Sequence, residues 1–248
     1  MLSDGSHAEG YKTTASGGLG ARAEGSYTTE LGQSSHAEGF QTLAGYACHA
    51  EGNQTTASGQ FSHAEGGFTK AIGNASHAEG SYTTVLSDGS HAEGYKTTAS
   101  GGLGAHAEGA GTTASNICAH AEGSVTIASG YASHAEGFRT TASGFGSHAG
   151  GANGLSAPYG VTLASGFGSF VHGSASTASG TYSIVLGPNI TGTTDNTVYV
   201  PNFVIKKASA VPTSSADSVG EDGSVTWDNN YFYWKANGQW LRVNGSTF

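Results

Sequence analysis

Ser6-His7-Ala8-Glu9-Gly10 is the first of a series of related pentapeptides that continue, intact or slightly altered, to about residue 173. A second pentapeptide, Thr13-Thr14-Ala15-Ser16-Gly17, alternates with the first at half the repeat length. The steps between successive histidine slots are 15, 14, 13, 14, 14, 14, 15, 14, 14, 14 and 24 residues. A repeat this regular decides the fold class, because each unit must form the same local structure and stack on its neighbours.

All eleven histidines occupy one slot of the repeat, and a column of glutamates follows two residues later. The first slot holds, in chain order, His7, Arg22, His36, His49, His63, His77, His91, His106, His120, His134, His148 and His172. The second slot holds Glu9, Glu24, Glu38, Glu51, Glu65, Glu79, Glu93, Glu108, Glu122 and Glu136.

The repeat predicts an all-β solenoid. Five residues are too few for a useful helix, and a glycine about every seven residues would break one, whereas a short strand can end in a glycine turn. Two strands and two turns per repeat make one coil, and about twelve coils would stack their strands in parallel ~4.8 Å apart. Only small side chains fit inside so narrow a coil. We therefore expect Ala and Gly to face inward and His, Glu and a Thr/Ser column to face outward.

The remaining composition agrees with a thin repeat structure. The chain has 41 glycines in 248 residues, only 11% charged residues, and a net charge of −9 that comes largely from the glutamate column. We expect aromatic residues to fill the edges at the turns, namely Tyr11, Phe40, Tyr46, Phe61, Tyr95, Tyr131, Phe138 and Phe145. No basic patch indicates nucleic-acid binding, and no apolar run indicates membrane insertion. Cys48 and Cys118 lie about five coils apart, too far for an intrachain disulfide.

Ser-x-Ala-x-Gly half-repeats at this spacing resemble the left-handed parallel β-roll head of trimeric autotransporter (YadA-like) adhesins, over residues 3–187. The sequences of the two pentapeptides are similar to repeats of bacteriophage tail and fibre proteins. The resemblance implies a homotrimer of rolls. This sequence departs from the adhesin pattern at the two x positions, which are mostly aliphatic there and are His and Glu here.

The histidine and glutamate columns allow two interpretations. The favoured one is a hydrogen-bonded ladder at a trimer interface, without metal or cofactor. Its residues would be His7, His36, His49, His63, His77, His91, His106, His120, His134, Glu9, Glu38, Glu51, Glu65, Glu79, Glu93, Glu108, Glu122 and Glu136. Such a trimer should weaken or change size between about pH 4 and 6, where His and Glu titrate. The alternative is transition-metal binding, because His and carboxylates are metal ligands, but Arg22 in the slot could pair with Glu24 and could not ligate.

Four segments follow from the places where the repeat changes. Residues 1–182 form the β-roll, with a loop insertion near 150–160 that either caps the roll or makes a contact. Residues 183–205 resemble the neck of such adhesins, and 206–223 read as a polar linker. Residues 224–248 hold all three tryptophans and predict a three-stranded β-meander tip with a tight Asn-Gly turn.

The sequence of residues 224–248 is similar to small C-terminal modules of phage tail proteins. Most of its aromatics should pack, and the rest would form a receptor-binding platform. The candidate receptor residues are Tyr231, Tyr233, Trp234, Trp240 and Arg242, with Tyr159 in the inserted loop.

We therefore expect a trimeric, extracellular structural and adhesion protein: the distal part of a phage tail fibre that attaches to a glycan or protein on the host surface. Its other partners would be tail proteins of the virion, reached through an N-terminal part missing from a chain that opens mid-pattern. A first alternative is the head of a bacterial trimeric adhesin on the cell surface, which a compact end at Phe248 disfavours. A second is an ice-binding solenoid, although the threonine column is interrupted. No nucleophile or lone acid stands out from the repeat, so no catalytic residues or enzymatic activity are expected.

Overall fold

The computed structural model describes residues 5–152, 160–202, 212–216, 218, 222–227 and 231–244, and within these ranges the fold is all β without a helix. The chain divides into two compact units, Met1–Pro201 and Asn202–Phe248. The first unit is a parallel β-solenoid, and the second contains a small antiparallel sheet. The predicted fold class is therefore confirmed.

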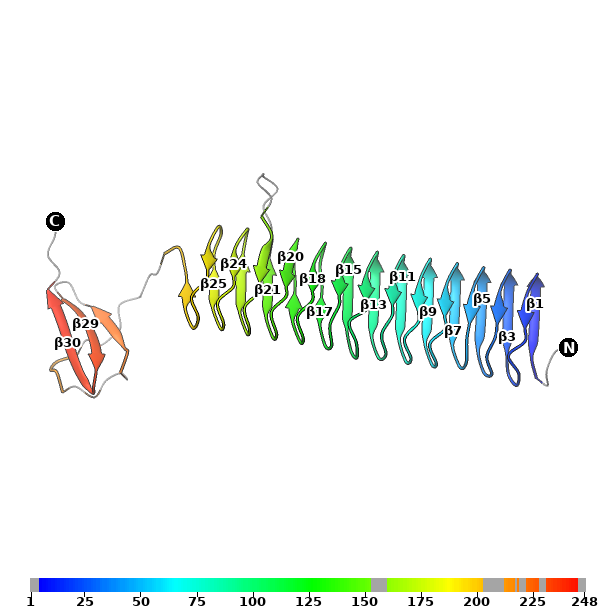
Figure 1. The fold of residues 1–248 in the computed structure, drawn as a ribbon, viewed down its shortest axis with the longest axis horizontal. Helices are drawn as coiled ribbons and strands as arrows, with labels where there is room; N and C mark the ends of the chain where they lie inside the picture. The colour runs from blue at the N-terminus through cyan, green and yellow to red at the C-terminus, as the bar shows by residue number, and fades with distance from the viewer. Residues whose placement is uncertain are drawn as a thin grey trace. The chain divides into compact units, whose positions relative to one another are not determined.

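Two parallel sheets of 14 and 13 strands build the solenoid (Figure 1). The first sheet contains β1 (His7–Tyr11), β3 (Arg22–Ser26), β5 (His36–Phe40), β7 (His49–Asn53), β9 (His63–Gly67), β11 (His77–Ser81), β13 (His91–Tyr95), β15 (His106–Ala110), β17 (His120–Ala121), β19 (His134–Ala135), β21 (His148–Gly151), β23 (Phe170–Gly173), β25 (Ile184–Leu186) and β27 (Val198–Tyr199). The second contains β2 (Thr14–Ala15), β4 (Thr29–Glu30), β6 (Leu43–Ala44), β8 (Thr56–Ala57), β10 (Lys70–Ala71), β12 (Thr84–Val85), β14 (Thr98–Ala99), β16 (Thr113–Ala114), β18 (Ile127–Ala128), β20 (Thr140–Ala142), β22 (Thr162–Ala164), β24 (Thr177–Ala178) and β26 (Thr191–Gly192).

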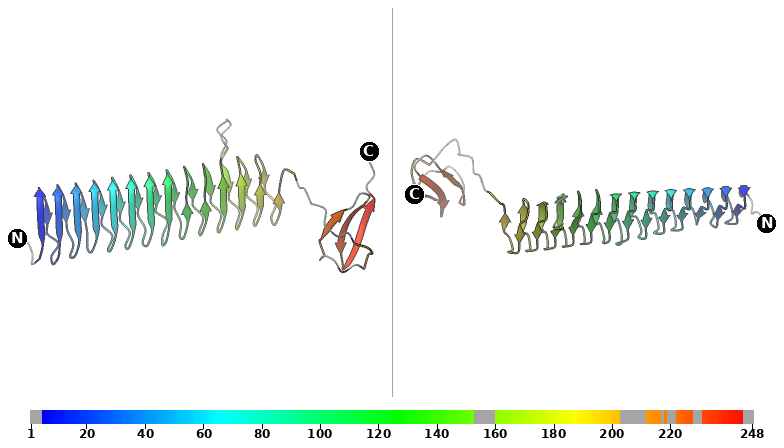
Figure 2. Two further views of the ribbon diagram at one scale, coloured as in Figure 1. Left: turned by 180° about the vertical axis from the view of Figure 1, so that it is seen from behind. Right: turned by 90° about the horizontal axis from the view of Figure 1, so that it is seen from above.

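Each coil contributes one strand to each sheet, and the views from behind and from above show the coils in one regular stack (Figure 2). Pairing is in register, so each residue lies above its counterpart one repeat away, for example His77 beside His63 and Glu79 beside Glu65. The sequence period thus becomes a set of columns that run along the solenoid.

The interior is a column of small residues, with the alanines inward as predicted, whereas the glycines of the first half-repeat, such as Gly66, are exposed. The central alanines of both half-repeats, such as Ala78 and Ala99, have no exposed surface, and the first threonine of the second half, such as Thr97, is also fully buried. Glu30 is an exception, because it is fully buried where neighbouring coils carry alanine. Its carboxylate accepts hydrogen bonds from the backbone N–H of Gly17 (3.0 Å) and from the hydroxyl of Ser35.

The aromatic residues lie at turns or, as with Tyr11, Phe40 and Tyr95, at the last residue of a strand, and they face outward from the solenoid. Phe61 is 63% exposed and Phe145 is 50% exposed. Their rings stack on one another along the edge, as in the pair Tyr131–Phe145, whose centroids are 4.8 Å apart. They cover the edges without entering the interior, because the space between the sheets accommodates only small side chains.

The solenoid extends past residue 182, where its end was predicted. The strands β25, β26 and β27 continue both sheets through Tyr199, and Val185 occupies the buried place of the alanines. The segment 183–201 therefore packs as further coils of the roll.

The insertion changes the register after β21. His148 pairs with Phe170, 22 residues later, so the inserted segment adds eight residues to the repeat rather than ten. His172 pairs with Gly150 and lies in the glutamate column. The prediction that all eleven histidines share one slot is wrong for His172, because counting histidines cannot show which residue a strand places opposite its neighbour. Tyr159 lies outside the described residues.

The second unit contains a three-stranded antiparallel sheet in the order β28 (Val225–Trp227), β29 (Tyr231–Ala236) and β30 (Gln239–Asn244). Asn237 and Gly238 form the β29–β30 turn with φ of +50° and +72°, the positive values that this tight hairpin requires. The predicted meander and its Asn-Gly turn are confirmed.

Candidate functional sites

The first candidate site is the outer surface of the first sheet, which we call the His–Glu face. It consists of the histidine and glutamate columns of β1 to β21. Because side chains alternate along a strand, burying alanine leaves the His and Glu on either side of it facing outward. From His36 to His148, the histidine side chains that pair with glutamates are 30–38% exposed.

The histidine rings form a continuous stack. Seven consecutive ring pairs from His36 to His134 have centroids 4.7–5.0 Å apart and planes within 6° of parallel. In-register pairing imposes this spacing, which equals the distance between adjacent strands. The stack ends at His148, which is turned by 65° relative to His134 and is followed by Phe170.

Most histidines approach the glutamate of their own strand without a regular hydrogen bond. From His36 to His106, the Nε2 atoms lie 3.4–3.8 Å from the nearest glutamate oxygen. Hydrogen bonds to a glutamate are made by His7, His134 and His148, at 3.1–3.3 Å. The column therefore contains shielded ring nitrogens that have no hydrogen-bond partner within the chain, at His36, His49, His63, His77, His91, His106 and His120.

The columns shift each other's protonation. Burial, and then the charges of the neighbouring histidines, lower the pKa of His63, His91 and His120. Burial and a hydrogen bond with Glu93 raise the pKa of Glu79. A hydrogen bond with Glu122, followed by burial, raises the pKa of Glu108. Burial would raise the pKa of Glu122, but its hydrogen bonds with Glu108 and His134 lower it. Neutral forms are therefore favoured at His63, His91 and His120.

Arg22 occupies a histidine slot and pairs with the glutamate of its own strand. Its Nη2 and Nε atoms both lie 2.6 Å from Oε1 of Glu24. The predicted pairing of this arginine is confirmed, and it shows that a cationic donor is compatible with the slot.

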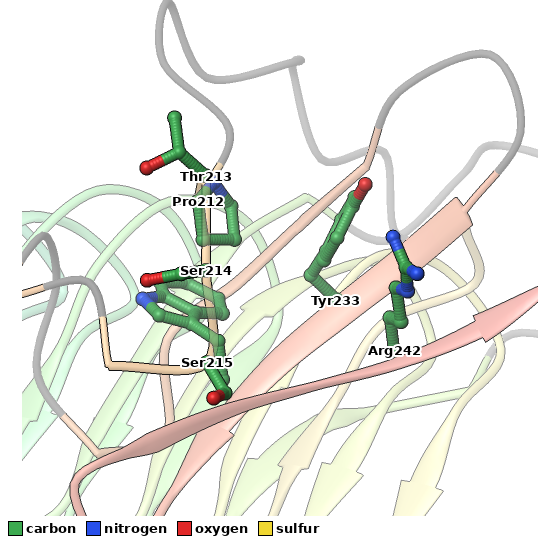
Figure 3. Close-up of a pocket in the computed structure, with 7 residues that line it drawn as sticks. Pro212, Thr213, Ser214, Ser215, Tyr233 and Arg242 are labelled. Carbon is green, nitrogen blue, oxygen red and sulfur yellow. The ribbon is translucent and has the colours of Figure 1, made fainter.

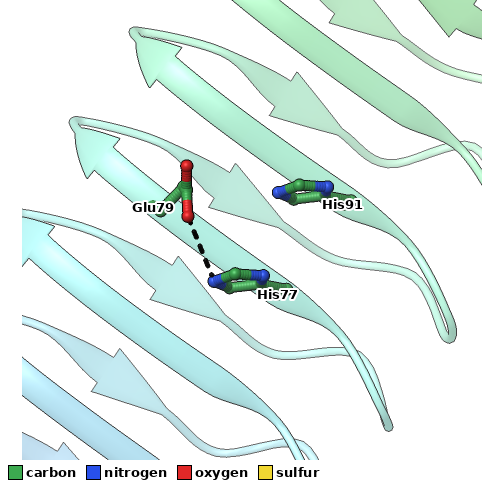
Figure 4. A group of neighbouring side chains, drawn as sticks. All are labelled: His77, Glu79 and His91. Carbon is green, nitrogen blue, oxygen red and sulfur yellow. Dashed lines mark ion pairs between the residues drawn. The ribbon is translucent and has the colours of Figure 1, made fainter.

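Several groups on the His–Glu face place three possible metal ligands close together. In the described residues, the ligand atoms of His77, Glu79 and His91 lie within 4.8 Å of one another (Figure 4). The ligand atoms of His106, Glu108 and His120 are equally close. Similar groups are His7–Glu9–Glu24, Glu24–His36–Glu38 and Glu122–His134–Glu136. The face can thus offer imidazole nitrogen and carboxylate oxygen to one ion.

The second candidate site is a pocket of about 270 Å³ in the C-terminal unit, which we call the tip pocket (Figure 3). It is lined by Pro212, Thr213, Ser214, Ser215, Tyr233, Trp240 and Arg242. The backbone N–H of Trp240 donates to the carbonyl of Ser215 at 2.9 Å, which fixes the segment 212–216 against β30.

Aromatic packing and an exposed cation define the chemistry of the tip pocket. Tyr233 and Trp240 are each 7% exposed and form part of its wall, whereas Arg242 is exposed. The guanidinium of Arg242 lies 4.4 Å from the centre of the Tyr231 ring, where a cation–π contact positions it. An arginine beside hydroxyls and aromatic surface suits a small ligand that carries hydroxyl or acidic groups.

The structure brings together three of the six predicted receptor residues: Tyr233, Trp240 and Arg242 line the pocket. Tyr231 contacts Arg242, and the alternation of β29 places Trp234 on the opposite face from Tyr233. Sequence reasoning missed Pro212 and residues 213–215, which it assigned to a linker. A polar Ser/Thr segment carries no signal that it folds over a sheet.

No protein-family model matches the chain, and no curated protein matches its sequence. Among the described residues, no helix is long and apolar enough to cross a membrane.

Proposed function

We propose that the chain is a structural and attachment protein, the distal part of a phage tail fibre, in which the solenoid is a stiff spacer and the C-terminal unit contacts the host surface. The observation that carries this proposal is the division into a regular solenoid and a separate unit whose pocket collects Tyr233, Trp240 and Arg242. At ~4.8 Å per coil, thirteen coils span about 60 Å, a suitable length for a spacer.

The solenoid itself supports a role in assembly. Its core is built from alanine, threonine and serine, which bury little apolar area per residue, so association between chains would add the stability that the interior lacks. The His–Glu face is flat, regular and half-buried, and three copies around an axis could satisfy each other's ring nitrogens.

We expect sedimentation equilibrium at pH 7.5 to give the mass of three chains, and the mass to fall between about pH 4 and 6 as the His–Glu face titrates. Substituting His63→Ala and His91→Ala should reduce the trimer fraction. Replacing Thr56 and Thr84 by alanine, on the second sheet, should leave it unchanged. A monomer at all concentrations would contradict the trimer.

Attachment is tested by binding of the full chain to an array of bacterial capsular and lipopolysaccharide glycans. We expect Arg242→Ala to weaken binding by about tenfold or more, because truncating a hot-spot arginine costs about 2 kcal/mol or more. Leu241→Ala is the matched control, since Leu241 is the neighbouring residue on the other face of β30 and is 42% exposed.

Absence of binding to these glycans and to outer-surface protein extracts would contradict the attachment function. Equal affinity of the Arg242→Ala variant and the parent chain would place the contact elsewhere on the molecule. Three tips on one fibre would add avidity, so the comparison uses the affinity of each single site, measured at low surface density.

A further inference from the structure

The ring nitrogens of the His–Glu face require a partner. Seven histidine Nε2 atoms are shielded from solvent and have no hydrogen-bond partner within the chain. Leaving a buried polar atom unsatisfied is costly, and native structures contain few such atoms. A neutral imidazole nitrogen is also the commonest metal ligand in proteins.

The distances on each strand match a metal site better than a hydrogen bond. Good N–H···O hydrogen bonds measure 2.7–3.2 Å. The Nε2 atom of His49 lies 3.4 Å from Glu51, and that of His77 lies 3.5 Å from Glu79. Two ligands on a tetrahedral ion with bonds of 2.0–2.1 Å are about 3.3 Å apart. One His-x-Glu strand therefore already provides two ligands at nearly the required separation.

We propose that the His–Glu face binds divalent transition-metal ions of the zinc class, each held by the His and Glu of one coil and the His of the next. The sites that combine two histidines with one glutamate are His77–Glu79–His91, shown in Figure 4, and His106–Glu108–His120. Their side chains are half-buried, so the second ring can turn toward the ion, and water completes the fourth position.

The donor set selects the class of metal. Two imidazoles and one carboxylate suit zinc, copper and nickel, whereas calcium needs six to eight oxygen ligands. A dication between two coils also neutralises glutamates that the stacking places one strand spacing apart. This inference is independent of the attachment function, since it concerns only the solenoid.

The repeat limits the number of ions. Each ion uses two coils, so adjacent sites would compete for the same ring. With the sites at His77–His91 and His106–His120 occupied, the stack from His36 to His134 leaves one further adjacent pair of rings, so about three ions per chain are expected.

The test uses the full chain without a histidine tag, with Cys48→Ala and Cys118→Ser to remove thiols, stripped with EDTA. Equilibrium dialysis against zinc chloride at pH 7.5, with bound metal measured by mass spectrometry, should give saturable binding of about three ions per chain. Calcium at the same concentration should not bind. Cobalt should give the intense visible absorption of a tetrahedral site.

Two variants locate the ions. His77→Asn combined with His91→Asn should lose about one ion per chain, and so should Glu79→Gln, which changes only the carboxylate. The matched control is Thr84→Ala with Thr98→Ala, in the same coils but on the second sheet. Circular dichroism in EDTA confirms that each variant keeps its strands.

Fewer than one zinc ion per chain would overturn the proposal. An unchanged number of bound ions in folded Glu79→Gln would also overturn it. A ratio of one ion per three chains for each pair of coils would overturn it too, because the metal would then lie between chains.

Discussion

Gly66→Ala should separate the solenoid between β9 and β11 and lower its stability by about 3 kcal/mol or more. Gly66 has φ of +101°, and a Cβ on it would overlap the carbonyl oxygen of Gly80 in the next coil and lie 3.0 Å from its carbonyl carbon. Neither the backbone angle nor the close approach of the two strands accepts a side chain. The effect should be measured by thermal melting and by hydrogen exchange, with loss of protection centred on residues 63–81.

Gly67→Ala is the matched control, one residue further along the same strand. A Cβ there has no neighbour closer than 3.9 Å, and Gly67 has no positive φ. The free energy of unfolding of this variant should stay within about 1 kcal/mol of that of the parent chain. If the two substitutions lower the stability equally, close contact between adjacent strands is not the reason why glycine occupies this position of the repeat.

Acidification should destabilise the solenoid through its histidine stack. Burial and neighbouring histidines lower the pKa of His63, His91 and His120 in the folded chain, so the unfolded chain binds more protons. The sign follows from linkage: this stability is complete above the unfolded pKa of about 6.5 and is lost as pH falls through the lower folded values. Trimer formation would bury the rings further and would act in the same direction.

Two glutamates oppose this trend, whereas Glu122, whose pKa is lowered, acts with the histidines. The pKa values of Glu79 and Glu108 are raised in the folded chain, so their contribution is present at low pH and is lost as pH rises through the folded values. The histidines should dominate below pH 6.5, because charged rings 4.8 Å apart repel by about 0.9 kcal/mol per pair even in water, before attraction to the glutamates offsets part of this.

We expect the melting temperature in EDTA to fall by roughly 5–10 °C between pH 7.5 and 5.5. For a chain of this size, each kcal/mol of lost stability lowers the melting temperature by about 2–4 °C. A variant with His63→Gln, His91→Gln and His120→Gln should show a flatter profile. Replacing Thr56, Thr84 and Thr113 by serine, on the second sheet, should not flatten it. Stability that is constant or rises on acidification would contradict the prediction.

The fold could be predicted because one physical constraint repeats in every coil. Glycine and alanine at fixed spacing allow two short strands to close on each other, and His and Glu on the other face must then point outward. Glu30 shows the limit of this reasoning. A buried carboxylate in the alanine column depends on Gly17 and Ser35, whose positions around it follow only from the stacking of coils.

The candidate sites were only partly predictable. The sequence identified the two ladder columns and three residues of the tip pocket, but it could not show that Arg242 packs on Tyr231 or that residues 212–215 close the pocket. These contacts join segments with no shared pattern, and their geometry depends on where the sheet presents its side chains.

The sequence by itself determined the period, the parallel sheets and the inward alanine face, because only small residues fit between two sheets so close together. Only the tertiary structure decided the register after the insertion, where His172 leaves the histidine slot. It also decided the distances on the His–Glu face, since a strand spacing of 4.8 Å stacks the rings but leaves Nε2 of His77 3.5 Å from Glu79. Composition and spacing specify which residues share a column; the contacts that each column makes are set by the packing of the coils.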